Sequence, residues 1–139
     1  MNSTKSVSAS IKIQAASPIV WRIITSPKFS KTLGNQFDEN SYVESDWKLG
    51  SKVYFKYQHE PGKSVNTGTI TRLIEEELIQ VNYRFFLFWT YVEKYSMHQG
   101  AGVTQLTIDA GPYGSDLEDQ KIVWGKWLAK VKELSEAEA

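Results

Sequence analysis

The chain has 139 residues, of which 41% are hydrophobic and 23% are charged. This length predicts a single domain, covering residues 1–139, that buries roughly 70% of the surface exposed by its unfolded chain. The hydrophobic content is too high for a disordered chain, which could not offset its ordering entropy by burial. Sixteen basic and sixteen acidic residues cancel, so the overall charge favours neither nucleic acid nor an anionic membrane. The absence of cysteine excludes disulfides, thiolate nucleophiles and cysteine-ligated zinc.

Targeting and membrane-spanning segments are not evident in the sequence. The polar start, residues 1–5, has no apolar stretch behind it of the kind a secretion signal needs. The longest apolar run, residues 85–89, is far shorter than the ~20 residues that span a bilayer. We therefore expect a cytoplasmic protein without a membrane partner.

The first part of the chain predicts one strand followed by two short helices. Residues 7–13 alternate apolar and polar side chains, which is the period of a half-buried strand. Ser17 and Pro18 then predict a helix start, with the serine as cap and the proline at the first helical position. The same pair of residue types recurs at Ser26 and Pro27 and predicts a second short helix that ends near Gly34.

The middle of the chain, from Phe37 to residue 110, predicts closely spaced strands. Apolar and polar residues alternate between turns expected at residues 46–51, 61–63, 75–77 and 100–102. Such spacing favours an antiparallel meander over alternating strands and helices.

The last element predicted is an amphipathic helix. Ser115 and Glu118 fit a capping box at its start. Trp124, Leu128 and Val131 share one face at helical spacing, so the helix can cover one face of the sheet. The resulting fold class is α+β.

Several stretches also resemble a known family: residues 16–21, 24–27, 45–51, 68–70, 95–97 and 102–108, and Trp124 in the last helix. They resemble the START-like, birch-pollen-allergen-like (SRPBCC) superfamily, and more narrowly the family related to the C-terminal domain of the activator of the heat-shock-protein-90 ATPase. The resemblance implies a helix-grip fold, in which a curved antiparallel sheet of about seven strands wraps around the C-terminal helix. It also implies a cavity between them, because members mostly bind apolar or amphiphilic small molecules and wider relatives are cyclases, hydratases and lipid carriers.

Other chemistries find little support in the sequence. The glycines at residues 100–102 and 111–114 do not link a strand to a helix with the spacing of a phosphate-binding loop. His59 and His98 are the only histidines, and surface positions suit them better than metal ligation. Serine hydrolysis would need a nucleophile elbow that the sequence does not contain. We expect neither a metal nor a cofactor.

Glu93 is the carboxylate with the most distinctive position. Strand alternation places it on the same side as Tyr91, Tyr95 and Met97, where an apolar environment would raise its pKa and suit it to acid–base catalysis. Alternatively, this side faces solvent at Glu93, or Lys94 or Arg84 pairs with it across the strands.

A set of mainly aromatic residues is predicted on the concave side of the sheet. Such residues suit a pocket that holds an apolar ligand and orients it by a few hydrogen bonds, but they could equally fill a solid core. The set comprises Phe55, Tyr57, Val81, Tyr83, Phe85, Tyr95 and Met97 from the strands, with Trp124 and Leu128 from the helix.

Residues 85–89 break the alternation and place aromatic side chains on both sides of the chain. This segment could be a lid over the pocket, a dimer surface, or a strand end that curls over the cavity mouth.

Three functions follow as hypotheses. The first is a binding domain for a small hydrophobic or amphiphilic ligand, oriented by Tyr57, Tyr83, Tyr95 and Glu93. The second is an enzyme of the cyclase or hydratase kind that uses Glu93 as acid or base. The third is a protein-interaction module, a homodimer or a chaperone partner, that uses residues 85–89.

Overall fold

The computed structural model describes residues 5–38, 41–57, 64–85 and 89–139. The strands are β1 (Val7–Ile13), β2 (Ser41–Ser45), β3 (Lys52–Tyr57), β4 (Ser64–Ile74), β5 (Leu78–Phe85), β6 (Trp89–Gly100) and β7 (Val103–Gly111). The helices are α1 (Ser17–Thr25), a 3₁₀ helix (Pro27–Phe29), α2 (Ser30–Gly34) and α3 (Leu117–Glu138).

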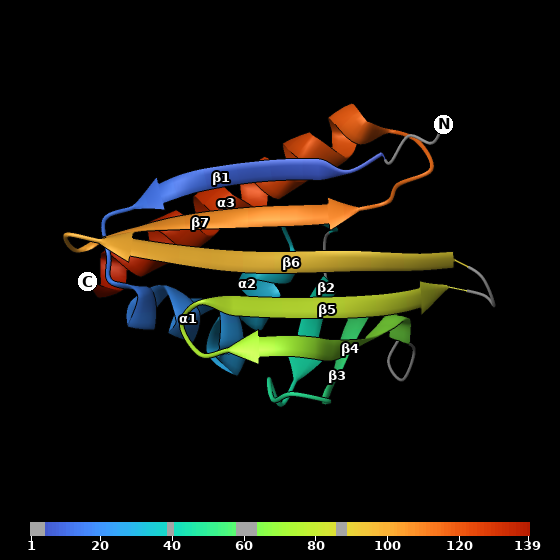
Figure 1. Ribbon diagram of the computed structural model, residues 1–139, viewed down its shortest axis with the longest axis horizontal. Coiled ribbons are helices and arrows are strands. Elements are labelled where there is room, and N and C mark those ends of the chain that lie inside the picture. The colour runs from blue at the N-terminus through green and yellow to red at the C-terminus, as the bar shows by residue number, and fades with distance from the viewer. Residues whose placement is uncertain (1–4, 39–40, 58–63, 86–88) are drawn as a thin grey trace.

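The strands form one antiparallel sheet in the order β1-β7-β6-β5-β4-β3-β2. The meander from β2 to β7 is therefore as expected, and β1 pairs with β7 at the other edge. In Figure 1 the strands β2 and β3 turn away from the direction of the other five, so the sheet is strongly curled. Register shifts after Phe55 in β3 and after Ile70 in β4 mark irregularities of the kind that bend a sheet.

All the helices lie on the concave face of the sheet. The long helix α3 runs behind β1 and β7 in Figure 1, α2 lies behind β5 and β6, and α1 lies at the left by the turn between β4 and β5. Trp124, Trp127, Leu128 and Val131 of α3 are buried, as their helical spacing predicts. This arrangement is the helix-grip fold, and the prediction of fold class is confirmed.

The side chains that face the core from the strands are also those that the alternation predicts. Ile79, Val81 and Tyr83 of β5 are buried, and so are Leu106 and Ile108 of β7. Side chains two positions apart along a strand point to the same face, so these residues form one continuous apolar wall opposite the helices.

Two of the predicted helix caps are wrong. Ala16, not Ser17, is the N-cap of α1, although a proline does stand in its first turn. At α3 the N-cap is Asp116, in a left-handed conformation with φ of 61°, and no side chain caps the helix. Ser115 donates to the Asp116 carboxylate at 3.3 Å instead, so the capping box with Glu118 is absent. The predicted cap at Ser26 is confirmed, since its hydroxyl accepts from the Lys28 amide.

Gly34 fixes the short helix α2 against the sheet. A Cβ at this position would lie 2.4 Å from the carbonyl oxygen of Ser41, so only glycine permits this approach. The buried Ser41 hydroxyl donates to the Gly34 carbonyl at 2.6 Å. α2 is thereby held beside β2, at one side of the cavity described below.

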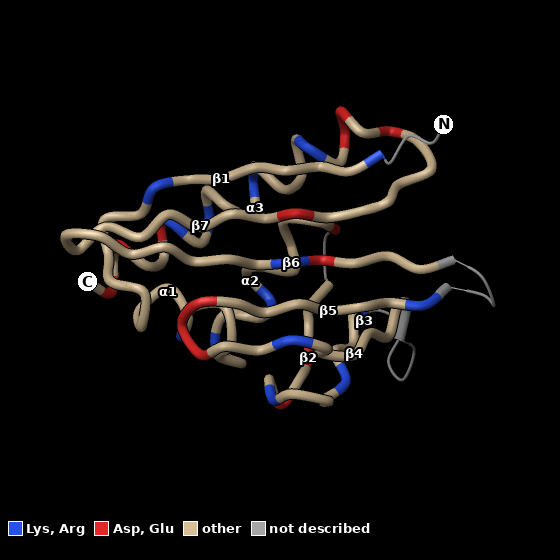
Figure 2. The backbone as a smooth tube through the Cα atoms, viewed as in Figure 1, with Lys and Arg blue, Asp and Glu red and all other residues tan. Residues whose placement is uncertain are grey.

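Charges of both signs are spread over the elements in Figure 2, with an acidic stretch at the turn between β4 and β5, residues 75–77. Within the described residues, none of the helices has the length and apolarity needed to cross a membrane.

Candidate ligand-binding cavity

A cavity of about 660 Å³ lies between the concave face of the sheet and the helices. Its walls come from the end of α1, the 3₁₀ helix, α2, strands β2 to β6, the turn after β2, the segment after β7 and the first half of α3. This volume is within the range of small-molecule sites. The aromatic residues therefore do not fill the space completely, which answers the question that the sequence left open between a pocket and a solid core.

Of the nine residues predicted to bind a ligand, five line the cavity: Phe55, Val81, Tyr83, Tyr95 and Trp124. Met97 and Leu128 are buried in the core and do not contribute to this lining. The side chains of Tyr57 and Phe85 lie outside the described residues, as does His59. The proposed aromatic surface at residues 85–89 lies there too, apart from the backbone of its two end residues.

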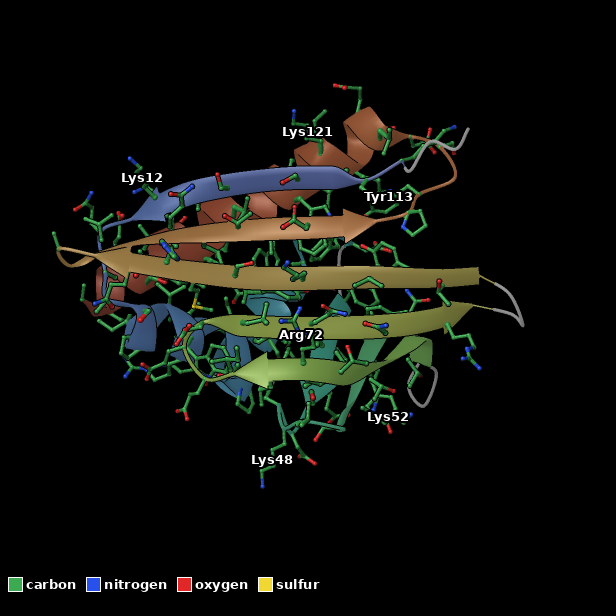
Figure 3. All side chains as sticks on the ribbon, viewed as in Figure 1. Lys12, Lys48, Lys52, Arg72, Tyr113 and Lys121 are labelled. Carbon is green, nitrogen blue, oxygen red and sulfur yellow. The ribbon has the colours of Figure 1, made fainter. Side chains whose placement is uncertain are left out.

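The structure adds cavity residues that the sequence prediction omitted. Tyr91 could have been included, because it alternates in phase with Tyr95 on β6. Trp127 follows Trp124 by three positions on the same helix face. Tyr113 could not have been found in this way, because it lies in the non-periodic segment between β7 and α3 (Figure 3). Phe37, Tyr42 and Trp47 also line the cavity.

Glu93 is placed on the cavity wall by its two neighbouring strands. It stands opposite Val81 of β5 and Ala110 of β7, both of which are buried. The prediction that it shares a side with Tyr91, Tyr95 and Met97 is confirmed. The alternatives, exposure to bulk solvent or pairing with Lys94 or Arg84, are wrong, because the carboxylate lines the cavity and accepts hydrogen bonds from two tyrosines.

Those two hydrogen bonds come from the residues on either side of Glu93 along the strand. The Tyr95 hydroxyl donates to Oε1 at 2.6 Å and the Tyr91 hydroxyl donates to Oε2 at 3.0 Å. Burial raises the pKa of Glu93 above its ordinary value, and the two hydroxyl donors lower it by a smaller amount. The carboxyl group thus has a weaker acidity than an exposed glutamate.

The tyrosines around Glu93 remain protonated. Burial raises the pKa of Tyr83, Tyr91 and Tyr95, and the negative charge of Glu93 raises it further. Each phenol therefore carries one proton to donate.

The hydrogen bonds continue beyond Glu93 to α3. The hydroxyls of Tyr91 and Tyr113 are 2.6 Å apart, and Trp124 Nε1 donates to the Tyr113 hydroxyl at 2.9 Å. Because the single proton of Tyr91 goes to Glu93, Tyr113 must be the donor between the two phenols. The chain then has one direction, from Trp124 through Tyr113 and Tyr91 to the carboxylate.

Aromatic contacts hold this polar chain in a fixed position. The ring centroids of Tyr91 are 5.2 Å from Tyr113 and 5.7 Å from Tyr83. Tyr95 packs 5.4 Å from Trp127, and Phe37 meets Trp124 edge-on at 4.8 Å. Such pairs fall within the distances of favourable ring contacts. The polar groups are consequently set in an apolar, aromatic wall.

The cavity reaches the surface of the protein, because several of its lining residues are exposed. They are Pro27, Lys31, Glu44, Asp46, Pro112 and Gly114. These residues place the opening of the cavity between α2, the turn after β2 and the segment after β7.

Metal ligation gains no support from the described part of the chain, which contains no group of three His, Cys, Asp or Glu residues arranged to hold a metal ion. His98 is exposed at the far end of β6.

No family model matches the sequence, and a search of curated proteins found no significant match. Solved structures do match. An Aha1 dimer from Colwellia psychrerythraea is similar with a TM-score of 0.73 and 14% identity, over 94% of this chain and 96% of that chain. An HSP90 activator from Plasmodium falciparum is similar with a TM-score of 0.72 and 14% identity, over 94% and 95%. This chain has the fold of the Aha1-like proteins.

A third similar structure is the AHSA1-like protein from Aeromonas hydrophila, with a TM-score of 0.70 and 15% identity over 94% of this chain and 93% of that chain. At these identities the likeness concerns the fold. The dimer and the HSP90 activation belong to the proteins so described.

Proposed function

We propose that this protein binds a small hydrophobic or amphiphilic molecule in the cavity. The observation that carries the proposal is the combination of an aromatic-walled space of about 660 Å³ with one connected group of polar side chains on its wall. Ligand sites in proteins are commonly apolar cavities with a few polar groups that fix orientation.

The walls account for affinity and the polar group for orientation. Phe37, Phe55 and Trp124 would remove the apolar part of a ligand from water, at about 25 cal/mol for each Å² buried. Glu93 and the tyrosines around it would align the ligand's polar end, because a polar group in a dry site needs a hydrogen-bond partner.

The first test identifies what the cavity holds. Native mass spectrometry of protein purified gently from its own source would report a retained small molecule and the oligomeric state together. We expect an adduct, whose chemical identification then supplies the ligand for binding studies.

The second test uses a probe and blocks the cavity. N-phenyl-1-naphthylamine is uncharged and fluoresces more strongly in apolar sites. We expect saturable fluorescence with the wild-type protein and its loss in Val43→Trp, since Val43 lines the cavity and the indole would occupy the space. Ile122→Trp adds the same side chain at an exposed position on α3 and should bind the probe normally. Equal binding by both variants would place the probe outside the cavity.

An enzymatic function is the second candidate, and the observation in its favour is the raised pKa of Glu93 inside the cavity. A carboxyl group that titrates closer to neutral pH can both donate and accept protons in a cyclase- or hydratase-type reaction. If so, Glu93→Gln should abolish turnover of the identified ligand while leaving its affinity largely intact.

An interaction through residues 85–89, with a second copy or a chaperone, stays a prediction. Size-exclusion chromatography with light scattering on the wild type and Trp89→Ala tests it: self-association that Trp89→Ala abolishes would support a dimer.

A further inference from the structure

The chemical class of the ligand's polar end follows from the donors and acceptors of the hydrogen-bonded network around Glu93, an argument that rests on the proposed binding function. With Glu93 ionised, the network has four donating groups among the described residues. They are the Trp124 N–H, the Tyr113 hydroxyl, the Tyr91 hydroxyl and the Tyr95 hydroxyl. Each has one proton, and each proton is used inside the network.

Acceptors, in contrast, remain available. Each oxygen of the Glu93 carboxylate accepts one hydrogen bond from a tyrosine, while a carboxylate oxygen can accept two. The group that this network presents to the cavity is therefore an anionic acceptor. A ligand meets it best with a donor of its own.

The charge of Glu93 is also uncompensated. No described Lys or Arg forms an ion pair with it, and the groups that shift its pKa are tyrosine hydroxyls and burial. Among the described residues, the other charged groups facing the cavity are Lys31 of α2, Glu44 of β2 and Asp46 after it, all on exposed residues at the opening. The neighbouring strands face Glu93 with Val81, Tyr83 and Ala110, and α3 with tryptophans. A buried carboxylate without a cation has lost hydration, and a positively charged partner that also donates a hydrogen bond offsets part of that cost.

Aromatic rings surround the same position. Tyr83, Tyr91 and Tyr95 flank Glu93 on the sheet, and Tyr113 and Trp124 face it from the segment and helix opposite. The faces of such rings attract a cation within about 6 Å through their quadrupoles.

We propose that the cavity selects an amphiphilic amine, whose protonated nitrogen donates to Glu93 among the tyrosine rings and whose apolar part lies against Phe37 and Phe55. Ligands with a carboxylate or phosphate head are disfavoured by the same carboxylate.

The experiment compares three probes that share one ring system: 2-(1-naphthyl)ethylamine, 2-(1-naphthyl)ethanol and 1-naphthaleneacetate. Isothermal titration calorimetry at neutral pH measures their affinities for the wild type, Glu93→Gln and Glu133→Gln. The last variant makes the same chemical change on the exposed side of α3, away from the cavity. We expect the affinity of the amine to be at least about tenfold higher than that of the alcohol, as a charged hydrogen bond implies. The acetate should bind weakest.

In Glu93→Gln the amine should lose its advantage while the alcohol binds as before, and Glu133→Gln should behave like the wild type. An alcohol that matches the amine in the wild type, or an amine preference that survives in Glu93→Gln, would overturn the assignment and leave the proposed binding function standing. No binding of either the amine or the alcohol would instead count against the binding function itself.

A second measurement uses the wild type alone, so it tests the assignment even if the Glu93→Gln variant does not fold. Titrations in buffers of different ionisation enthalpy report protons exchanged on binding. Because the amine favours the ionised carboxyl, its binding should release protons at a pH where Glu93 is partly protonated, and the alcohol should release fewer. Equal proton release by both probes would contradict an amine on Glu93.

Discussion

Tyr95 and Glu93 lie two positions apart on β6, and the Tyr95 hydroxyl donates a 2.6 Å hydrogen bond to Oε1 of Glu93. Period-two alternation places both side chains on the concave face, so the contact is a direct consequence of the strand. Burial raises the pKa of Glu93 and this hydrogen bond lowers it, with burial the larger effect. The opposing effects can be separated by mutation.

The first prediction concerns stability against pH. The pKa of Glu93 is higher in the folded protein than in the unfolded chain, so between these two values the folded state binds more protons. The free energy of unfolding should therefore fall as the pH rises through this window, by about 1.4 kcal/mol for each unit of pKa difference. Glu93→Gln should lack this loss and gain stability relative to the wild type as the pH increases.

Urea unfolding at a series of pH values, from below pH 4 to about pH 8, measures the effect. Glu133→Gln removes a carboxylate that is exposed, and its stability should follow that of the wild type. If the wild type and Glu93→Gln lose stability in parallel across the range, the carboxyl has no raised pKa.

The second prediction concerns the hydroxyl of Tyr95. Tyr95→Phe removes a donor that stabilises the ionised carboxylate, so the pKa of Glu93 should rise further. The loss should also cost about 1–3 kcal/mol in the free energy of unfolding at neutral pH, because the bond is to a charged group. Side-chain carboxyl ¹³C NMR gives the pKa directly. Tyr54→Phe makes the same change outside the cavity lining and should leave the pKa of Glu93 unchanged. An equal change of this pKa in both variants would show that the Tyr95 hydrogen bond does not lower it.

The fold could be predicted from the sequence because its strands carry a regular signal. Ile79, Val81 and Tyr83 alternate with polar residues over the whole of β5, and tertiary packing reinforces that pattern. Two of the three predicted helix caps failed, because a cap depends on single residues. Ser115 and Glu118 have the spacing of a capping box, but the left-handed conformation of Asp116 turns the serine toward the neighbouring carboxylate.

The candidate site could be predicted only in part, for a related reason. Alternation determines which face a side chain takes, and it placed Glu93, Tyr83 and Tyr95 correctly. It does not determine which part of that face the helices cover. Met97 is on the same face as Glu93 but is buried in the core and does not line the cavity. Tyr113 completes the polar network from a segment without any period, so its position depends on the tertiary structure alone.

The third prediction separates core from cavity. Leu128 is buried and does not line the cavity, so Leu128→Ala should lower the free energy of unfolding by about 2–5 kcal/mol and leave probe affinity unchanged under folding conditions. Phe55 lines the cavity and is half-buried, so Phe55→Ala should weaken binding of N-phenyl-1-naphthylamine at a smaller cost in stability. Fluorescence titration and urea unfolding of both variants check this. Weakened binding in Leu128→Ala alone would move the site into the core.

The fourth prediction uses two glycines with opposite surroundings. Gly68 of β4 lies under the cavity wall, where an added Cβ would come within 2.6 Å of Val81 Cγ1 and 2.8 Å of the Tyr83 ring. Gly68→Ala should push these side chains toward the cavity, lowering the free energy of unfolding by about 1–3 kcal/mol and weakening the probe. Gly125 is exposed within α3 and has nothing within 4 Å of an added Cβ.

Gly125→Ala should therefore stabilise the protein by about 1 kcal/mol, because alanine has the higher helix propensity, and should leave probe binding unchanged. Urea unfolding and probe titration measure the stability and the probe affinity of each variant. We expect both to fall in Gly68→Ala, and in Gly125→Ala we expect stability to rise with affinity unchanged. Normal binding in a destabilised Gly68→Ala would mean that Val81 and Tyr83 shift away from the cavity, and that Tyr83 does not define its wall for the ligand.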